Sequence, residues 1–573
     1  MSPVSPSATF SPQALHERAT RALQAGAYAE AARLLEQAPD DANFNALRGI
    51  HAQLTGDNEA AVVFFDKVLA NRKNTPEVVL NKVRSLTQLK RFDDAVKILE
   101  DFIAVMPGAA AFVLLSEIYE QMKDKPKAVE AMGRALAKGA KAPEITGNYW
   151  LGKRDLCDWS EPLPDFAISD ITPAVATVIS ADPAFQRQVA EYFCRTRFPQ
   201  SAPRPVPKPV TGRRIRIGYL SADIHFHATA FLIAELFALH DKTFFETFCF
   251  SYGGDDESAI RQRIKDTAEH FIDLKNMPLP DVVNAIRGYD VDVLVDLKGH
   301  TRNHALAVLA QRPAPIQIHY LGHPGTIGAS FIDYLVGDDI VTPPGCEAHY
   351  TEKLIRMPGS YQINDRVRPI ADTKPRSAYG LPDDKTVLAV FNQTYKITPE
   401  MFAIWMDIMK ARPDTVLWLF QSVKHAEDNL RREAEKAGVD PARLFFAPLA
   451  ANDEHLARYR TVDIVMDTCP YGGHTTTSDA LWAGTPVVTL AGQTYPSRVA
   501  ASLLTNVGLP ELVTTTPAAY ENKIMELIDN PGERTRLRMH LGNVRGSCAL
   551  FDTPRWVKAW EEALLKIISG HKT

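Results

Sequence analysis

The amino-acid sequence predicts an all-α array of helical repeats followed by two α/β domains, each with a doubly wound parallel sheet. Three observations lead to this prediction. A small residue recurs at the spacing of helical-repeat proteins within the first 140 residues. A run with four prolines in ten residues, 201–210, then marks a boundary. Beyond it, strand-length apolar runs alternate with helical patterns in two successive sets.

The composition is that of a multidomain globular protein. The chain has 573 residues, of which 45% are hydrophobic and 23% charged, which excludes wholesale disorder and a continuous coiled coil. With a formal net charge of -5, the chain lacks the overall positive potential that a dedicated nucleic-acid or membrane-surface binder needs. We therefore expect neither of these partners, whereas a phosphorylated small ligand needs only a local lysine or arginine.

The sequence also indicates a cytoplasmic location. Its first residues have neither the basic flank nor the apolar core of a signal peptide. The longest apolar runs have the length of strands rather than of membrane spans. The six cysteines show no CxxC spacing, so we expect no zinc site and no disulfide framework.

Four similar segments predict pairs of packed helices in the first 140 residues. Each contains an alanine between two helical apolar patterns, with spacings of 30, 34 and 33 residues, at Ala31, Ala61, Ala95 and Ala128. A helix–turn–helix unit of this length, with a small residue where the two helices cross closely, resembles the tetratricopeptide repeat. Such an array either binds a polypeptide or protein partner on its concave surface or only stabilises or dimerises the protein.

Ten strand-length runs predict the two parallel sheets, because continuous apolar strands separated by helices are typical of sheets covered on both faces. The runs of the two sets are 215–220, 246–251, 292–297, 315–321 and 353–357, then 387–392, 415–420, 443–448, 463–467 and 486–490. Ligands of such sheets bind beyond the carboxyl ends of the strands. The candidate site therefore consists of the residues that follow each strand.

Two loops of the first set carry candidate residues. The loop after the first strand contains Asp223, His225 and His227. A histidine there can act as a general base or hydrogen-bond an anionic oxygen, and a helix-capping or packing histidine is the alternative. The loop 322–328 has three glycines in seven residues, which allow backbone amides to approach a ligand or simply form tight turns.

Three loops of the second set suit a nucleotide. Lys396 follows the first strand of this set and can neutralise a phosphate, unless it is an ordinary solvated lysine. His455 and Arg458 share a helix face, where a flat ring and a guanidinium suit a nucleobase. Two glycines and three threonines at 472–477 open a helix that offers amides and a positive end to an anion. Asp479, one turn further, can reach a ribose hydroxyl.

Together these motifs resemble the family of tetratricopeptide-bearing O-GlcNAc transferases, and the likeness covers nearly the whole chain. Five segments occur in the family's order: Ser221–Thr229, Leu321–Gly328, Phe391–Lys396, His455–Arg458 and Gly473–Pro486. The resemblance implies a GT-B fold of two Rossmann-like domains and UDP-N-acetylglucosamine as the donor. It also implies inversion at the anomeric carbon, transfer to Ser or Thr of polypeptides, and no metal.

The resemblance implies roles for individual residues. His227 corresponds to an active-site histidine that acts as a base or positions the acceptor, and Asp296 to a strand-end aspartate proposed in proton transfer. Lys396 corresponds to the lysine on the diphosphate, so His227, Lys396 and Asp296 are the expected catalytic residues. The expected donor-binding residues are Gln393, Lys396, Ala450, His455, Arg458, His474, Thr475, Thr476, Thr477, Asp479, Gly322, Pro324 and Gly325.

The sequence departs from the animal members in several places. Tyr471 stands where they have a cysteine, so the N-acetyl pocket is expected to differ, and Asn452 stands where a ribose-contacting lysine is expected. Only a short connector around 368–380 lies between the two α/β domains, where animal members carry a large inserted domain. The Asp-Val-Asp sequence at 290–292 begins a strand, and we expect it to be structural rather than metal-binding.

The expected domains are repeats over 1–140, a helical connector and proline-rich linker over 141–210, an acceptor-side domain over 211–380 and a UDP-binding domain with a closing helix over 381–573. The leading hypothesis is a UDP-sugar-dependent transferase acting on polypeptides, and a homodimer is compatible with it. The alternatives are a different UDP-sugar, a repeat scaffold whose nucleotide-binding unit turns over slowly or not at all, and a pyridoxal-phosphate phosphorylase, which only Lys396 would support.

Overall fold

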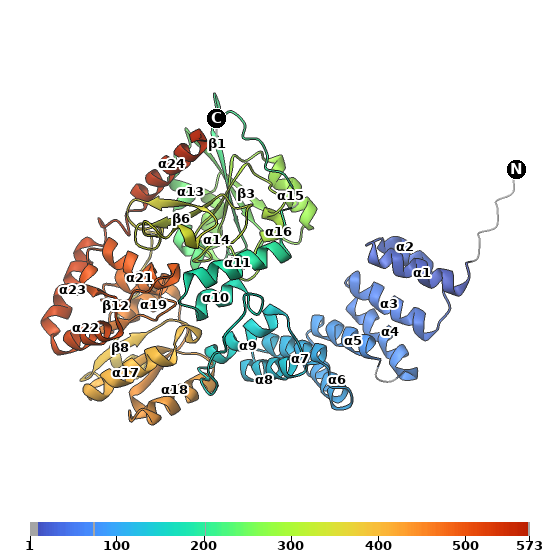
Figure 1. Cartoon of the computed structure of the whole chain (residues 1–573), viewed down its shortest axis with the longest axis horizontal. Helices are drawn as coiled ribbons and strands as arrows, with labels where there is room; N and C mark the ends of the chain where they lie inside the picture. The colour runs from blue at the N-terminus through green and yellow to red at the C-terminus, as the bar shows by residue number, and fades with distance from the viewer. Residues whose placement is uncertain (1–9, 73–74, 201, 571–573) are drawn as a thin grey trace. The chain divides into compact units, whose positions relative to one another are not determined.

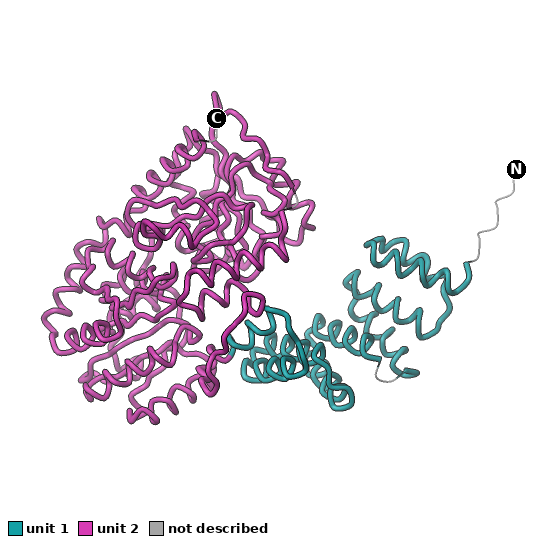
Figure 2. Tube along the Cα trace, viewed as in Figure 1, with its two compact units in different colours: residues 1–152 teal, residues 153–573 magenta. Residues whose placement is uncertain are grey.

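The computed structural model describes residues 10–72, 75–200 and 202–570. The chain divides into two compact units, one up to Gly152 and the other from Lys153 onward, which Figure 2 shows in different colours. Each unit has hydrophobic core residues of its own.

Unit 1 consists of helices that pack as successive pairs. The helices are α1 (Pro12–Gln24), α2 (Tyr28–Glu36), α3 (Ala42–Leu54), α4 (Asn58–Asn71), α5 (Pro76–Gln88), α6 (Phe92–Val105), α7 (Ala109–Gln121), α8 (Lys125–Ala137) and α9 (Pro143–Asp155). The four recurring alanines, Ala31, Ala61, Ala95 and Ala128, are all buried. Their burial fits small residues at close helix crossings and confirms the predicted helical repeats.

The first α/β domain of unit 2 contains a parallel sheet of seven strands in the order β3-β2-β1-β4-β5-β6-β7. The strands are β1 (Ile215–Ser221), β2 (Phe245–Ser251), β3 (His270–Asp273), β4 (Val293–Asp296), β5 (Ile316–His319), β6 (Tyr334–Asp338) and β7 (Lys353–Met357). The helices between them are α12 (Ala228–Ile233), α13 (Leu236–Leu239), α14 (Ala259–Thr267), α15 (Leu279–Gly288) and α16 (Leu306–Leu309).

The second α/β domain contains a parallel sheet of six strands in the order β10-β9-β8-β11-β12-β13. The strands are β8 (Thr386–Val390), β9 (Thr415–Phe420), β10 (Leu444–Ala447), β11 (Ile464–Met466), β12 (Val487–Leu490) and β13 (Val513–Thr514). Its helices are α17 (Pro399–Ala411), α18 (Lys424–Lys436), α19 (Asn452–Tyr459), α20 (Thr475–Ala483), α21 (Tyr495–Asn506), α22 (Pro517–Asp529) and α23 (Pro531–Val544). Short 3-10 helices are η1 (Glu347–His349), η2 (Arg376–Tyr379), η3 (Thr394–Lys396), η4 (Pro441–Arg443) and η5 (Pro510–Leu512).

The predicted fold class is confirmed, since helical repeats are followed by two parallel sheets. All ten predicted strands occur, with ends that differ by one or two residues where they differ. Three strands were not predicted: β3, which is partly exposed, β6, and β13, which has only two residues.

Two helices and an irregular segment lead into the first sheet. Helices α10 (Pro173–Ile179) and α11 (Pro183–Arg197) precede residues 202–210, which form neither helix nor strand. Lys208 in that segment pairs with Asp290 at 2.6 Å, and Arg213, just after it, binds both oxygens of Asp292 at 2.6 and 2.7 Å. The Asp-Val-Asp sequence therefore forms ion pairs at the amino end of β4.

The last helix, α24 (Thr553–Gly570), returns from the second α/β domain to the first, as Figure 1 shows in red beside α13. Trp560 donates its indole N–H to the hydroxyl of Tyr219 on β1 at 2.9 Å. Trp556 stacks on Tyr320, just beyond β5, with ring centroids 5.5 Å apart. The first sheet is therefore completed by the far end of the described chain.

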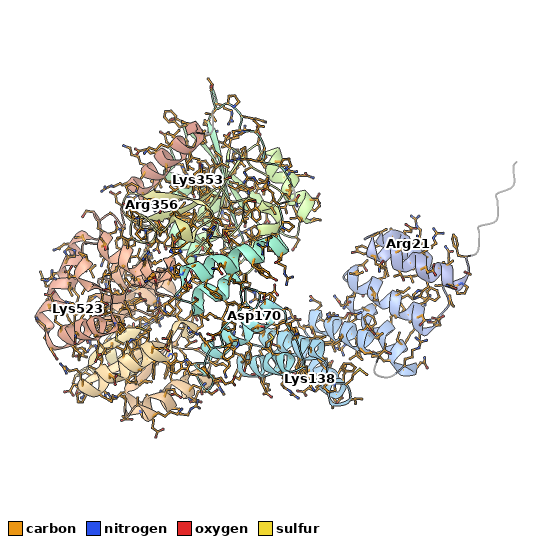
Figure 3. The ribbon with its side chains drawn as sticks, in the orientation of Figure 1. Arg21, Lys138, Asp170, Lys353, Arg356 and Lys523 are labelled. Carbon is orange, nitrogen blue, oxygen red and sulfur yellow. The ribbon has the colours of Figure 1, made fainter. Side chains whose placement is uncertain are left out.

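The outer strand β7 carries charged side chains, two of which Figure 3 labels. Lys353 is exposed, and Arg356 pairs with Glu347 at 2.6 Å. Charges on an edge strand discourage pairing with other chains. Among the described residues, no helix combines the length and the apolar character needed to cross a membrane.

Candidate functional site

The carboxyl ends of the two sheets lie against each other within unit 2. Tyr495, which begins α21 beyond the end of β12, donates its hydroxyl to the carbonyl of Val336 on β6 at 3.0 Å. Ser502 on α21 donates to Asp338, the last residue of β6, at 2.6 Å. Because the loops that follow parallel strands gather at these ends, loops of both α/β domains border one region.

Lys396 ends the short helix η3, directly after β8. Its side chain is buried, and its Nζ atom donates to the carbonyl of Gly472 at 2.9 Å and lies 4.3 Å from the centroid of the Tyr471 ring. Burial lowers the pKa of Lys396 to about 8, and the Asp467 carboxylate opposes that shift. The ammonium is therefore mostly charged at neutral pH, in a dry environment where an anion would interact strongly with it.

The loop between β11 and α20 is fixed tightly against β8. Asp467 accepts from the amide of Gly473 at 2.6 Å and from the side chain of Asn392 at 3.1 Å. A Cβ atom on Gly473 would lie 2.5 Å from the hydroxyl oxygen of Thr477, so only glycine fits without displacing the hydroxyls at the start of α20. The first turn of α20, whose amides lack intrahelical partners, is thereby placed beside the Lys396 loop.

His474 immediately precedes α20 and stacks on Tyr471, with ring centroids 5.1 Å apart. Burial lowers the pKa of His474 well below its usual value, so the ring is neutral at physiological pH. Its Nε2 atom is buried and has no hydrogen-bond partner within the part of the chain that the structure describes. Such atoms are rare in folded proteins, and this one marks a point where a polar ligand can bind.

His455 and Arg458 lie on one face of α19. Arg458 donates through Nε to Nδ1 of His455 at 2.9 Å and through Nη1 to the carbonyl of Pro448 at 2.6 Å. Burial, with the charge of Arg458, lowers the pKa of His455 to about 3. Since the neutral ring accepts at Nδ1, its hydrogen is on Nε2, which lies 4.0 Å from Oδ2 of Asp479.

Asp479 is buried one turn into α20 and forms an ion pair with Arg368. Its Oδ1 atom accepts from Nη2 of the arginine. Burial raises the pKa of the Asp479 carboxyl, and the guanidinium opposes that shift. Arg368 lies in the connector between the two sheets, in a segment that none of the sequence motifs includes.

Two other expected donor-site residues lie on loops at the same end of the second sheet. Ala450 follows β10, next to Leu449, whose side chain is 86% exposed. Gln393 follows β8 with an exposed side chain, and its carbonyl accepts from the amide of Lys396 at 3.0 Å. Both positions are accessible to a ligand at this end of the sheet.

His227 caps helix α12. Its Nδ1 atom accepts from the amide of Thr229 at 3.2 Å and lies 3.6 Å from Oδ2 of Asp223. Burial lowers the pKa of His227, Asp223 opposes the shift and Lys298 adds to it. The neutral ring therefore uses its lone pair at Nδ1 and carries its hydrogen on Nε2. In this state His227 can donate a hydrogen bond, whereas action as a base requires it to release the cap.

Lys298 and Asp223 form a buried ion pair beneath this loop. Nζ of Lys298 lies 2.7 and 2.9 Å from the two oxygens of Asp223. Lys298 stands two residues beyond β4 and comes from a different loop than Asp223. The pair therefore links the loops that follow β1 and β4.

Asp296 is fully buried at the end of β4. Its oxygens accept from the amides of Lys298 at 3.1 Å and Gly299 at 2.7 Å, and one of them lies 3.2 Å from Nδ1 of His319. This geometry suits a residue that shapes the loop after β4. It is less suited to proton exchange with a substrate, which requires access to the carboxylate.

The glycine-containing loop after β5 packs against the end of β4. A Cβ atom on Gly322 would lie 2.2 Å from the carbonyl oxygen of Leu297, so glycine is required for this close approach. Gly322 is partly exposed, whereas Pro324 and Gly325 are buried. The structure thus gathers Lys396, His455, Arg458 and the 473–479 segment in the second domain, and His227, Asp296 and this loop in the first.

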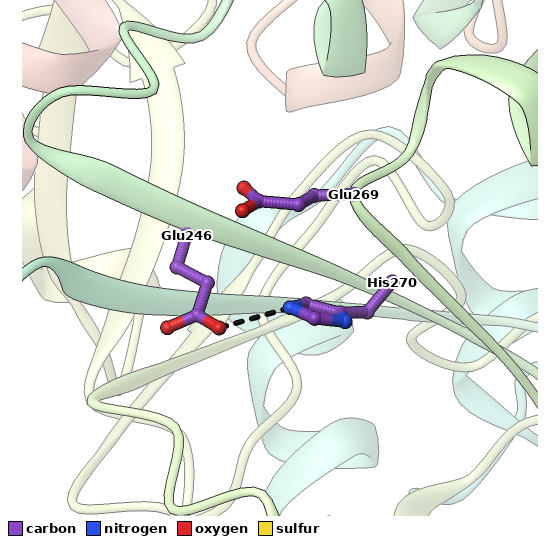
Figure 4. A group of neighbouring side chains, drawn as sticks. All are labelled: Glu246, Glu269 and His270. Carbon is purple, nitrogen blue, oxygen red and sulfur yellow. Dashed lines mark hydrogen bonds and ion pairs between the residues drawn. The ribbon is translucent and has the colours of Figure 1, made fainter.

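A separate cluster of two carboxylates and a histidine lies at the amino ends of β2 and β3 (Figure 4). Potential ligand atoms of Glu246, Glu269 and His270 all lie within 4.8 Å of one another. Arg216 pairs with Glu246 at 3.0 Å, and Arg214 pairs with Glu269 at 2.7 Å. Because both carboxylates already have cationic partners, we assign the cluster to an ion-pair network at the far ends of these strands.

A family model described as glycosyl transferase family 41 matches residues 200–374 and 370–560, which is more than half of the chain. The chain belongs to this family. A curated relative in Arabidopsis thaliana, the probable UDP-N-acetylglucosamine–peptide N-acetylglucosaminyltransferase SEC, is 37% identical over 409 residues, covering 70% of this chain and 42% of the relative. The UDP-N-acetylglucosamine–peptide N-acetylglucosaminyltransferase of Caenorhabditis elegans is 27% identical over 466 residues, covering 62% of this chain and 40% of the relative. The family 41 chain thus spans well under half the length of these relatives.

A solved structure of a mutant O-GlcNAc transferase from Thermobaculum terrenum is similar to this family 41 chain, with a TM-score of 0.70 and 25% identity. The match covers 92% of this chain and 98% of that chain. It supports the GT-B arrangement for the two parallel-sheet domains.

Proposed function

We propose that this chain is an inverting glycosyltransferase that moves N-acetylglucosamine from UDP-N-acetylglucosamine to Ser or Thr hydroxyls of polypeptides. The observation that carries the proposal is the buried ammonium of Lys396 beside the first turn of α20, at the carboxyl end of the second sheet. Membership of family 41 and the names of the relatives support the same activity.

The proposed reaction places negative charge next to these groups. The acceptor oxygen attacks the anomeric carbon while the bond from that carbon to the diphosphate breaks, and the electron pair stays on UDP. Lys396 and the amides at the start of α20 are positioned to stabilise this charge. Because the chain supplies the cation itself, we propose that transfer needs no metal.

We assign the nucleoside to the region between α19 and α20. The His455 ring and the Arg458 guanidinium offer flat surfaces for uracil, on the helix that follows the loop containing Ala450. Asp479 offers a carboxylate oxygen to the ribose. Gln393 and Thr475–Thr477 border the diphosphate beside Lys396, and His474 offers its unpaired Nε2 nearby.

His227 is assigned to the acceptor side as a group that positions a substrate oxygen. Its Nδ1 atom accepts from the backbone of α12, so the Nε2 hydrogen is the one available to a ligand. The hydroxyl proton of the acceptor then passes to water or to an oxygen of the leaving diphosphate. Asp296, Gly322, Pro324 and Gly325 shape the loops on this side.

A transferase specific for another UDP-sugar is the second candidate. It is favoured by Tyr471, whose ring contacts both Lys396 and His474 where the animal members have a cysteine. Competition of UDP-N-acetylglucosamine with UDP-glucose distinguishes the two sugars. A phosphorylase would show visible absorbance from pyridoxal phosphate on Lys396, and a non-catalytic scaffold would bind UDP without consuming donor.

We further propose that unit 1 binds polypeptide acceptors or protein partners. A hollow of about 370 Å³ on unit 1 is lined mainly by small and apolar residues of α7 and of the segment that leads into α9, together with Arg84, Glu117 and Lys141. An extended peptide with mixed polar and apolar side chains fits such a surface. Homodimer formation, a cytoplasmic location and the domain boundaries at 140, 210 and 380 remain part of this proposal.

The proposed function is tested by calorimetric titration of UDP and UDP-N-acetylglucosamine, each with EDTA and with magnesium. Metal-independent binding of both ligands, followed by mass spectrometric detection of a HexNAc adduct on Ser or Thr of incubated proteins, is the expected result. Failure of UDP to bind would exclude the transferase and leave a repeat protein on a GT-B scaffold.

A further inference from the structure

The connector between β7 and β8 contains an arginine with a buried side chain. Only 7% of the Arg368 side chain is exposed, although the adjacent Val367 is 62% exposed. Connectors usually run over the surface, and burial of a guanidinium is costly unless it is paired. The position of Arg368 therefore requires a specific set of partners.

Arg368 is attached to α20 through both its side chain and its backbone. Nη2 donates to Oδ1 of Asp479, and the guanidinium carbon lies 5.7 Å from the centroid of the Trp482 ring. The carbonyl oxygen of Arg368 accepts from Nε1 of Trp482 at 3.1 Å. Asp479 and Trp482 are three residues apart, so the arginine contacts a single face of the helix.

With these contacts made, two polar groups at one point of the site still have hydrogen-bonding capacity that no neighbouring residue in the described part of the chain satisfies. Nη1 of Arg368 is buried and has no hydrogen-bond partner in residues 10–72, 75–200 and 202–570. Oδ2 of Asp479 lies 4.0 Å from Nε2 of His455, which is too far for a direct hydrogen bond. A buried guanidinium nitrogen without a partner loses its hydration with no compensation. A polar ligand that reaches Arg368 and Asp479 together would supply the missing bonds.

We infer that Arg368 is a nucleotide-binding residue that recognises the ribose together with Asp479, an inference that rests on the proposed nucleotide-sugar function. Arg368 fixes Oδ1 of Asp479 and leaves Oδ2 for a ribose hydroxyl, while its own Nη1 donates to a second ribose oxygen. Adjacent hydroxyls suit this pair because each can donate to a carboxylate and accept from a guanidinium. A phosphate suits it less, because the Asp479 carboxylate would repel a second anion at this distance.

The test compares UDP with 2′-deoxy-UDP, which lacks one ribose hydroxyl, by calorimetric titration of the full chain. We expect the wild type to prefer UDP, on the order of 10-fold or more, as for hydrogen bonds to charged groups. In Arg368→Met, UDP affinity should fall by roughly 10–100-fold and the preference over 2′-deoxy-UDP should largely disappear. The ratio of the affinities for UDP and 2′-deoxy-UDP is informative, because a general loss of protein stability would weaken the binding of both ligands to the same extent.

Arg376→Met is the matched control. Arg376 lies in the same connector and pairs with Asp463 at 2.6 Å, but Asp463 precedes β11 and is therefore at the amino end of the sheet. This variant should lose an ion pair yet keep the wild-type ratio. A double-mutant cycle of Arg368→Met with Asp479→Asn should show strong non-additivity in UDP affinity, because the two residues act on the same ribose.

Two results of these titrations would overturn the inference about Arg368. If the wild type prefers UDP and Arg368→Met retains that ratio, the ribose role of Arg368 is wrong while the transferase proposal stands. If the wild type does not bind UDP, both fail together. If Arg368→Met does not fold, Arg368→Lys replaces it, because a lysine keeps the charge beside Asp479 but lacks the fixed second nitrogen and should still lose the preference.

Discussion

The Nζ atom of Lys396 lies 4.3 Å from the centroid of the Tyr471 ring, within the range of a cation–π contact. Its hydrogen bond goes to a backbone carbonyl, that of Gly472, at 2.9 Å. Both of these partners are uncharged, and the nearby Asp467 carboxylate also favours the charged form of the lysine. A buried charge held in this way attracts an arriving diphosphate more strongly than a solvated lysine would.

Replacement of Lys396 by alanine should reduce turnover by roughly 10²–10³-fold, as expected for loss of one group that stabilises transition-state charge. Steady-state assays of UDP release measure this effect. Lys385→Ala is the control, because that lysine pairs with Asp414 at 2.6 Å just before β8, at the opposite end of the strand. Near-normal turnover of Lys396→Ala would remove this residue from the mechanism.

The pKa of Lys396 predicts how activity depends on pH. Burial lowers this pKa from 10.5 to about 8, so the free protein loses the charge as the pH rises through about 8. We expect kcat/KM to decline above that pH, since this parameter reports ionisations of the free enzyme. In Lys396→Arg the charge persists, and the decline should vanish whatever the absolute rate. A wild-type profile that stays flat to about pH 10 would contradict the assignment.

Two substitutions of His227 distinguish its role as the N-cap of α12 from its proposed contact with the substrate. Asparagine is a good N-cap, so His227→Asn should keep α12 stable, while His227→Ala should lose about 0.5–2 kcal/mol of stability. Both variants lack the Nε2 hydrogen and should transfer sugar poorly while binding UDP normally. Calorimetry with UDP and a transfer assay measure the two properties. Equal loss of UDP affinity and turnover would place His227 on the nucleotide side instead.

Gly473→Ala should abolish UDP binding without unfolding the chain. The new Cβ atom would lie 2.5 Å from the Thr477 hydroxyl and 2.7 Å from that of Thr476, so both hydroxyls at the start of α20 must move away from their positions beside the proposed ligand. The matched variant is Gly542→Ala, within helix α23, where a Cβ atom meets open space. That variant should bind UDP normally and gain up to about 1 kcal/mol of stability. Normal UDP binding by Gly473→Ala would show that the α20 turn does not contact the ligand.

Trp560→Ala should destabilise unit 2 by about 3–5 kcal/mol, the usual cost of removing a buried tryptophan. Trp560 is almost fully buried and donates to the hydroxyl of Tyr219 at 2.9 Å. Urea denaturation followed by fluorescence measures the change. Leu565→Ala on the same helix, at a side chain that is 41% exposed, should have a much smaller effect. Equal effects of the two substitutions would mean that the buried Trp560 side chain adds no more to the stability of unit 2 than an exposed leucine of the same helix.

Most of the fold could be predicted because the buried strands have a direct sequence signal. Strands such as β1 and β9 are nearly continuous apolar runs, as burial on both faces requires. In contrast, β3 is a four-residue strand with partly exposed side chains, and β13 has only two residues. Such strands depend on pairing with a neighbour rather than on their own composition.

The same distinction applies to the candidate site. Lys396, His227 and the glycines before α20 follow strands directly, so their position along the chain already indicates the ligand-binding end of a sheet. Lys298 carries the same signal, because it lies two residues beyond β4. Arg368 carries none, because its burial results from contacts with Asp479 and Trp482 on a helix that is distant in sequence.

The return of α24 to the first sheet also determines when the first α/β domain can finish folding during synthesis of the chain. Strands β1 to β7 leave the ribosome before the second sheet, but the tryptophans that cover Tyr219 and Tyr320 belong to the last helix described. The first α/β domain therefore emerges with an uncovered aromatic surface and stays unfinished until α24 has also been synthesised. Nascent chains at that stage are the ones that need protection by chaperones.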